Sequence, residues 1–231
     1  MASPILLILG AGPNIGTHVA KGFAAKGYRV ALASRKAHAL DDVIHIPVDL
    51  SMPESVPNVF ETVKSTLGAP PSVVVYNAAA IYPYHQSDPL SSLDAATYTE
   101  WMSVNTLSAL SALRQSVIGF KTLPPSCSKT FIYTGNMLNI KHIPGMMSLG
   151  LGKVSTAFII QYLSEIEEYK DDGISFYYAD ERTSDGEPVF NDISGSAAAD
   201  EYWKLAERKQ QGPWMHTFVS GHGYKDFGDG W

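Results

Sequence analysis

Cysteine, charged residues and long apolar runs are all scarce in this chain of 231 residues. The one cysteine, Cys127, excludes an internal disulfide and the cysteine-rich zinc motifs. Charged residues make up 17% of the chain, and the net charge of −6 disfavours binding to nucleic-acid phosphates. The apolar run over residues 4–9 is too short to span a membrane, and no basic segment precedes it. We therefore expect a soluble, cytoplasmic protein that binds neither nucleic acid nor membranes.

Short apolar segments alternate along the chain with longer amphipathic ones. The predicted strands cover residues 5–9, 28–34, 43–48, 72–76, 130–134, 174–179 and 215–219, and the predicted helices cover 15–26, 56–67, 94–120, 153–169 and 197–209. Strands that are apolar on both faces and alternate with helices predict an α/β fold with a doubly wound parallel sheet of about seven strands. We expect helices on both faces and one domain over residues 1–231, in which residues 221–231 form a flexible or subunit-contacting tail.

A glycine-rich turn follows the first predicted strand and leads into the first helix. Its sequence is Gly10-Ala11-Gly12-Pro13-Asn14-Ile15-Gly16. Small residues let the backbone approach a pyrophosphate, and the start of a helix offers unpaired N–H groups and a positive dipole end. In an alternating α/β chain this turn predicts a dinucleotide site that involves Gly10, Gly12, Asn14, Ile15 and Gly16. The alternative is a tight turn without a ligand.

Basic residues follow the second predicted strand, where an acidic residue would bind the 2′-hydroxyl of NAD. The chain reads Ser34-Arg35-Lys36 at this point. A guanidinium group suits a 2′-phosphate both by charge and by its two-pronged geometry. Ser34 and Arg35 therefore favour NADP over NAD, and the alternative is a solvated basic turn.

Four further short motifs follow the glycine-rich turn in order. They are Asp49-Leu50 after the third strand, Asn77-Ala78 after the fourth, Asn105 in the long helix 94–120 and Lys153 at the start of the next long helix. Taken together, the motifs resemble the short-chain dehydrogenase/reductase family, with its Rossmann fold, over nearly the whole chain. In that family the glycine motif has three glycines, and Asn14 stands here in place of the middle one.

The resemblance implies a role for each motif. The implied cofactor contacts are Asp49 and Leu50 at the adenine, Asn77 and Ala78 along the pocket, Lys153 at the nicotinamide ribose, and Thr183 at the nicotinamide amide. Asn105 is implied to hold a water molecule in a proton relay. Members of the family commonly pair through two long helices, here 94–120 and 153–169, so the resemblance also implies a homodimer or homotetramer.

Two positions depart from the family's catalytic pattern. The family has a tyrosine four residues before the lysine and a serine about 13 residues before that tyrosine. Leu149 and Asn136 occupy these positions here. Leucine cannot donate a proton, so Asn105, Asn136 and Lys153 remain as the candidate catalytic residues. Asn136 has two alternatives: its amide could donate to a substrate oxygen, or it could bond to its own backbone in a turn.

Three functional hypotheses remain open. The substrate could need little acid assistance, as an iminium ion or an activated alkene does. Another residue could supply the proton, and the candidates are Tyr82, Tyr84, His142, Tyr177 and Tyr178. The dinucleotide could instead be bound without turnover in a cyclase, an isomerase or a ligand sensor. We predict an NADP-dependent oxidoreductase that has a non-standard proton relay, acts on a small carbonyl, iminium or alkene substrate, and has no metal site, with the non-redox binder as the alternative.

Overall fold

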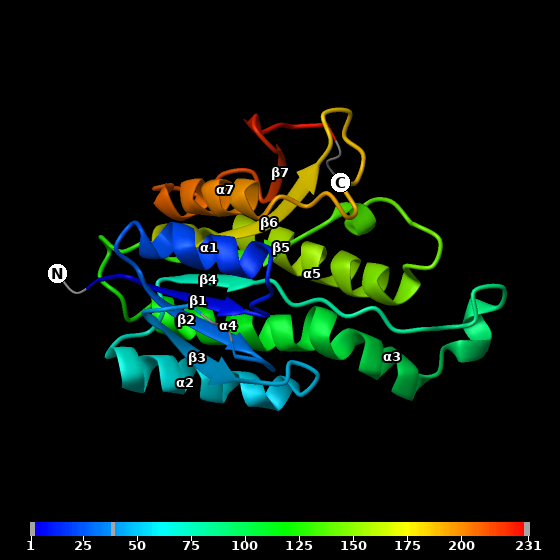
Figure 1. Cartoon of the computed structure of the whole chain (residues 1–231), viewed down its shortest axis with the longest axis horizontal. Coiled ribbons are helices and arrows are strands. Elements are labelled where there is room, and N and C mark those ends of the chain that lie inside the picture. Colours follow the sequence, from blue (N-terminus) through cyan, green and yellow to red (C-terminus); the bar gives the residue numbers. More distant parts are fainter. Residues whose placement is uncertain (1–2, 38–39, 229–231) are drawn as a thin grey trace.

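A single eight-stranded sheet runs through the protein, seen here in a computed structural model that describes residues 3–37 and 40–228 (Figure 1). The strands are β1 (Ile5–Leu9), β2 (Arg29–Ser34), β3 (Val43–Pro47), β4 (Val73–Tyr76), β5 (Thr130–Thr134), β6 (Ser175–Arg182), β7 (Met215–Val219) and β8 (Gly223–Tyr224). Their order in the sheet is β3-β2-β1-β4-β5-β6-β7-β8. Strands β1 to β7 pair in parallel, and β8 runs antiparallel to β7.

Helices cover both faces of this sheet. They are α1 (Ile15–Ala24), α2 (Val56–Leu67), α3 (Ala95–Met102), α4 (Ser108–Phe120), α5 (Met147–Glu165), α6 (Glu167–Asp171) and α7 (Gly195–Glu207). Short helical turns lie at η1 (Pro53–Ser55), η2 (Pro89–Ser92), η3 (Ser103–Leu107, a π-helical turn) and η4 (Met137–Asn139). In Figure 1, α1 and α7 lie side by side over one part of the sheet.

The strands are apolar on both sides because each side packs on helices. In β1, Leu7 and Leu9 contribute to a core shared with α2, α4 and α5. Leu6 and Ile8 point to the opposite face and pack with side chains of α1 and α7. This two-sided burial confirms the predicted doubly wound parallel sheet.

The eighth strand was not expected from the sequence. It lies in the segment predicted as a tail, where Lys225 N also donates to the Thr217 carbonyl oxygen of β7 at 3.0 Å. Gly223 takes a φ of +87°, which suits the sharp reversal after β7. Residues 229–231 of the predicted tail lie outside the described residues.

Two helix predictions were wrong in their bounds. Helix α5 begins at Met147, so Lys153 lies in its second turn rather than at its start. Gly150 and Gly152 lower the helix propensity of this segment, but packing against neighbouring elements overrides that preference. The long helix predicted over 94–120 is divided into α3 and α4 by the π-helical turn η3, a feature that the apolar periodicity did not reveal.

Candidate functional site

A cavity of about 530 Å³ lies at the carboxyl ends of β1, β2 and β4 and beside the segment after β3. It brings together eight predicted site residues, namely Gly10, Gly12, Ser34, Arg35, Asp49, Leu50, Asn77 and Ala78. We call it the first cavity. Open α/β sheets bind ligands at the carboxyl ends of parallel strands, and these distant motifs meet at that edge of the sheet.

Two glycines give the first cavity its shape. Gly10 has a φ of +83°, and a Cβ there would lie 2.4 Å from the Ala78 nitrogen, so only glycine allows this approach of two chain segments. The Asn77 amide fixes the same turn by donating to the Gly10 carbonyl oxygen at 2.9 Å. A Cβ on Gly12 would meet nothing within 4 Å. The space beside the Gly12 backbone is thus open.

Opposite charges stand at the far end of the first cavity. The Asp49 carboxylate accepts hydrogen bonds from the Ser51 nitrogen and hydroxyl, each at 2.9 Å. These bonds, with the charge of Arg35, hold the pKa of Asp49 below its usual value. Arg35 is exposed, and Ser34 turns its hydroxyl to the Lys36 carbonyl oxygen at 2.7 Å. The guanidinium is therefore free to face a ligand from the rim.

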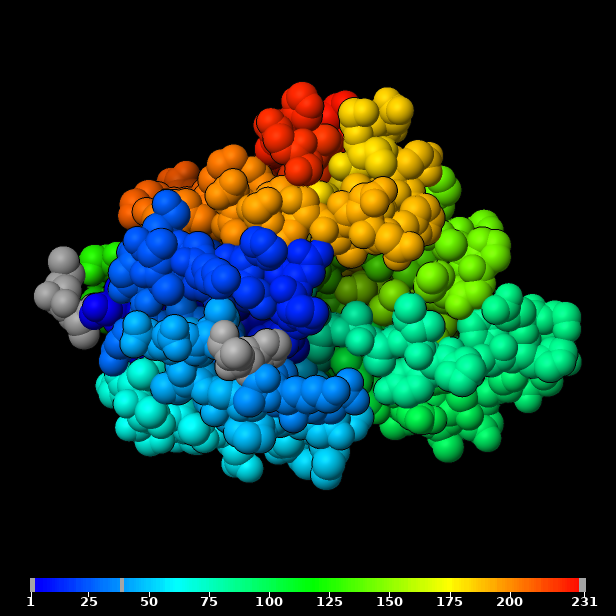
Figure 2. All heavy atoms as spheres, viewed as in Figure 1, coloured from blue at the N-terminus to red at the C-terminus, as the bar shows by residue number. Residues whose placement is uncertain are grey.

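A second cavity of about 300 Å³ opens at the carboxyl ends of β5 and β6. Figure 2 shows the surface hollowed where the blue, gold and teal parts of the chain meet. Ile15, Asn136 and Leu149 line this second cavity, together with apolar side chains of the segments 137–146 and 188–193. The polar lining residues are Thr134, Asn136, Asp180, Glu181, Asn191 and Tyr202.

Lys153 lies beneath the second cavity and does not line it. The side chain is 3% exposed, and Nζ donates to the Thr134 carbonyl oxygen at 2.7 Å. Nζ also lies 4.5 Å from the centre of the Tyr133 ring. Burial lowers the pKa of Lys153 to about 7, against the opposing charge of Asp180. The lysine is thus held by the protein rather than extended toward a ligand.

Asn105 is equally occupied by protein contacts. Its side chain makes a paired contact with the backbone of Ala80, with N–H···O distances of 2.9 and 2.8 Å. The backbone carbonyl oxygen of Asn105 accepts hydrogen bonds from the hydroxyls of Tyr133 and Thr156, both at 2.9 Å. Asn105 lies within the π-helical turn η3. Asn105 therefore braces the wall of the first cavity against β5 and α5.

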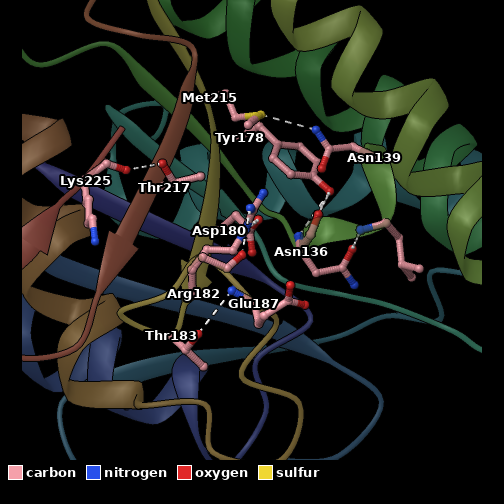
Figure 3. A network of polar contacts seen from close by, with 12 residues as sticks. Asn136, Asn139, Tyr178, Asp180, Arg182, Thr183, Glu187, Met215, Thr217 and Lys225 are labelled. Atoms are coloured by element: carbon pink, nitrogen blue, oxygen red, sulfur yellow. Dashed lines mark hydrogen bonds and ion pairs between the residues drawn. The ribbon is translucent and has the colours of Figure 1, made fainter. Parts of the chain in front are cut away.

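Asn136 adopts the turn conformation that was one of its two alternatives. Its side-chain oxygen accepts from the Leu138 nitrogen at 3.1 Å, and its backbone exchanges two hydrogen bonds with the Tyr178 hydroxyl (Figure 3). The carboxamide nitrogen of Asn136 has no hydrogen-bond partner among the described residues. That nitrogen leaves a donor at the wall of the second cavity.

The alternative proton donors do not line the second cavity in the part of the chain that is described. Tyr178 is tied to Asn136, and Tyr177 accepts from the Gly212 nitrogen at 3.0 Å. Tyr82 lines the first cavity instead, while Tyr84 and the exposed His142 line a third, outer cavity. The structure therefore does not bring a tyrosine or histidine of this group to the position that Leu149 occupies.

Three other predicted residues lie outside both cavities. Asn14 ties the glycine-rich turn to the segment before α7, because its side chain donates to the Ile193 oxygen at 2.8 Å and accepts from the Gly195 nitrogen at 3.1 Å. A Cβ on Gly16 would lie 2.9 Å from the Ala11 Cα, so Gly16 lets α1 start close to β1. Thr183 accepts from the Glu187 nitrogen at 3.1 Å within a reverse turn, away from the cavities.

Sequence reasoning missed three charged residues at the end of β6. Strand β6 continues past the predicted end at residue 179 through Asp180, Glu181 and Arg182, all buried. Arg182 Nε lies 2.5 Å from a carboxylate oxygen of Asp180 (Figure 3). Glu181 accepts from the Ser194 nitrogen at 2.8 Å, and burial raises the pKa of its carboxyl. Three successive charges directly after an apolar strand were the available signal.

The model of the short chain dehydrogenase family matches residues 4–121, and a curated relative covers the rest. That relative is the short chain dehydrogenase/reductase dmxR12 of Cryptosporiopsis sp. (strain 8999), which is 43% identical over 98% of this chain and 96% of its own. The chain belongs to the short-chain dehydrogenase/reductase family. Its mostly parallel sheet with helices on both faces is the fold of that family.

Solved structures share this short-chain dehydrogenase/reductase fold at low sequence identity. The NADH-dependent reductase A1-R′ responsible for alginate metabolism is 17% identical, with a TM-score of 0.79 over 95% of this chain and 97% of that one. BdcA in complex with NADPH is 15% identical, with a TM-score of 0.71 over 98% of this chain and 97% of that one. At these identities the likeness concerns the fold.

The described residues form neither a cluster of metal ligands nor a membrane-spanning helix. Within residues 3–37 and 40–228, no three histidine, cysteine or carboxylate side chains gather as metal ligands would. No helix in the described part of the chain is both long and apolar enough to cross a lipid bilayer.

Proposed function

We propose that this protein is an NADP-dependent oxidoreductase with a non-standard proton relay that acts on a small carbonyl, iminium or activated alkene substrate. The observation that carries the proposal is the continuity of the glycine-rich turn. Gly12 lines the first cavity and Ile15 lines the second, so one elongated ligand can lie across the turn and enter both. Family membership supports an oxidoreductase, and the open backbone at Gly12 fits a pyrophosphate.

Each cavity would hold a different part of the cofactor. Arg35 and Ser34 would take the 2′-phosphate, Asp49 and Leu50 the adenine, and Gly10, Gly12, Asn77 and Ala78 the centre of the dinucleotide. The nicotinamide, when bound, supplies or accepts a hydride. The apolar walls of the second cavity would keep water away from the reacting carbon.

The proton relay is the part of the proposal that departs from the family pattern. Leu149 lines the second cavity where the resemblance places a tyrosine, so no hydroxyl is available from that position. Asn136 retains a free amide nitrogen that can donate to a substrate oxygen. Lys153 and Asn105 would then position the residues around the site, Thr134 and Ala80, and would not touch the substrate.

One observation favours the alternative, a protein that binds the dinucleotide without turnover. The groups implied to move protons in the family are used internally here, since Lys153 donates to Thr134 and the Asn105 carbonyl accepts from two hydroxyls. A cyclase, an isomerase or a ligand sensor needs no such relay. Hydride transfer from deuterium-labelled NADPH to a product would separate the two functions.

We also propose that the protein assembles as a homodimer or homotetramer through α4 and α5. The exposed apolar side chains on these helices and on η3 are Leu107, Leu110, Ile118, Val154, Phe158 and Tyr162. A monomer rarely exposes so many large apolar side chains together, and a second copy would remove them from water.

Cofactor binding tests the proposed function directly. Titration calorimetry should show that NADPH binds more tightly than NADH, because Arg35 can pair with the additional phosphate. Replacing Arg35 with alanine should weaken NADPH binding about tenfold or more and leave NADH binding unchanged. Lys64→Ala, which removes a basic residue from the last turn of α2, is the matched control for net charge.

Failure to bind either dinucleotide would contradict both the oxidoreductase and the non-redox alternative. Equal weakening of NADPH and NADH in the Arg35 variant would contradict the assignment of NADP specificity to this residue.

A further inference from the structure

The second cavity joins apolar walls to an acidic end. Its lining residues in the described chain include the carboxylates of Asp180 and Glu181 but no lysine, arginine or histidine. Burying carboxylates at an apolar cavity is unfavourable unless positive charge compensates them. A carboxylate that has no cationic partner within the protein therefore indicates that the cavity binds a cationic ligand.

Asp180 already has its compensating charges within the protein. Arg182 Nε lies 2.5 Å from one of its oxygens, and Lys153, when protonated, adds a second attraction to Asp180. Both basic side chains are buried and neither lines the second cavity. The Asp180 carboxylate at the cavity wall is thus paired with a buried arginine of the protein.

Glu181 differs from Asp180 in this respect. It is 9% exposed, and one of its oxygens accepts from the Ser194 nitrogen at 2.8 Å. No basic side chain of the described residues forms an ion pair with it. A backbone N–H stabilises a carboxylate only in part. The remaining negative charge at the cavity wall is uncompensated unless a ligand brings a cation.

We propose that the second cavity binds a cationic nitrogen substrate, an iminium ion, and that Glu181 is its counter-ion. This inference rests on the proposed oxidoreductase function. It explains Leu149 and Glu181 together, because an iminium ion needs a negative charge beside it and does not need the acid that leucine cannot supply.

The reaction balances without a proton donor. A hydride from a reduced nicotinamide dinucleotide forms a new C–H bond at the iminium carbon, and the C=N π electrons become the lone pair of the nitrogen. The product is a neutral amine, and the dinucleotide is oxidised. Reduction of a ketone would instead leave an alkoxide that requires a proton, for which no tyrosine is present at position 149.

Binding and turnover of matched bicyclic compounds test this proposal. The cation is N-methyldihydroisoquinolinium, its reduced product is N-methyltetrahydroisoquinoline in the ammonium form, and the neutral comparison is tetralone. Calorimetry on wild-type protein with NADPH bound should show the ammonium binding more tightly than tetralone. NADPH oxidation should be observed with the iminium and not with tetralone.

Replacing Glu181 with glutamine removes the charge and keeps an oxygen for the Ser194 N–H group. We expect the ammonium to bind about tenfold or more weakly to this variant, while NADPH and tetralone bind as before. Glu187→Gln is the matched control, since Glu187 follows in the same segment but pairs with Lys141 at the surface. That control should retain wild-type affinity for all the compounds.

The outcomes distinguish this inference from the proposed function. If NADPH fails to bind the wild-type protein, the proposed function fails. If NADPH binds but the ammonium has no advantage over tetralone, the cationic substrate is refuted and the proposed function stands. If Glu181→Gln weakens only oxidised NADP binding, or abolishes ketone turnover without weakening the ammonium, Glu181 faces the cofactor ring or acts as an acid, and its assignment as counter-ion is overturned.

Discussion

The amino group of Lys153 is buried, so the free energy of unfolding depends on whether this group is protonated. Its ordinary pKa is about 10.4 in an unfolded chain, while burial lowers it to about 7 in the folded protein. Between these two values the unfolded chain binds one more proton than the folded protein. The free energy of unfolding therefore rises with pH across this window, and the penalty of the buried charge is fully present below pH 7.

We predict that Lys153→Met flattens this dependence. Urea unfolding at pH 7 and pH 9 should show the wild-type protein gaining roughly 2 kcal/mol more than the variant, since each pH unit contributes up to about 1.4 kcal/mol. Comparing the change in the free energy of unfolding with pH between the two proteins removes the contributions of all other titrating groups that they share. Equal slopes would mean that Lys153 is charged and solvated in the folded state.

Leu149 and Asn136 show how single side chains limit the chemistry available at the second cavity. Leu149 contributes only apolar surface to the second cavity, and Asn136 uses its side-chain oxygen in its own turn. The Tyr178 hydroxyl donates to the Asn136 backbone, and the hydroxyls of Thr134 and Tyr202, which line the cavity, bond to each other at 2.9 Å. Burial raises the pKa of Tyr178 well above its usual value, which makes the phenolate form inaccessible.

Helix α5 owes its position to one glycine. A Cβ on Gly152 would lie 2.2 Å from the Cβ of Asn105, so α5 can approach η3 this closely only because residue 152 has no side chain. Gly150, one half-turn earlier, has no neighbour within 4 Å of such a Cβ. The two glycines of one helix therefore serve different purposes, although the sequence presents them in the same way.

Alanine substitutions at these two glycines should have opposite effects. Gly152→Ala should destabilise the protein by about 1–3 kcal/mol or more, because the new methyl group forces α5 and η3 apart. Gly150→Ala should be neutral or stabilise by up to about 1 kcal/mol through improved helix propensity. Thermal unfolding of both variants checks this, and a similar loss in both would show that the contact with Asn105 is not the cause.

The proposed assembly of copies would use the outer surface of η3, α4 and α5. Phe158, on α5, is 59% exposed and lies among the apolar side chains proposed as the contact. A carboxylate at this position would have to be buried without a partner in any such interface. Leu90 is 77% exposed on η2, outside the proposed contact, and serves for comparison.

We predict that Phe158→Glu yields monomers while Leu90→Glu retains the assembly of the wild-type protein. Light scattering coupled to gel filtration gives the mass of each variant. A wild-type monomer, or a Phe158→Glu protein of unchanged mass, would contradict the assignment of the contact to α5. Activity measurements on the monomer would then show whether the site functions within one copy.

The order of elements and the meeting of the N-terminal motifs at one cavity could be predicted from the sequence. Burial on both faces gives strands a continuous apolar composition, and tight turns require glycine, so both leave local signals in the chain. The position of Gly10, Asp49 and Asn77 at the carboxyl ends of parallel strands then follows from the topology. Strand β8 was not predicted because a strand of two residues is too short to show an alternation of apolar and polar side chains.

Only the tertiary structure decided what the charged and amide side chains do. Asn14 bonds to residues 193 and 195, and Asn105 bonds to Ala80 and accepts from Tyr133, pairings between segments far apart in the chain. Likewise, the difference between a compensated Asp180 and an uncompensated Glu181 depends on which face of β6 each side chain occupies. Local sequence reflects periodicity and backbone conformation, whereas the partner of a buried polar group is set by how separate elements pack.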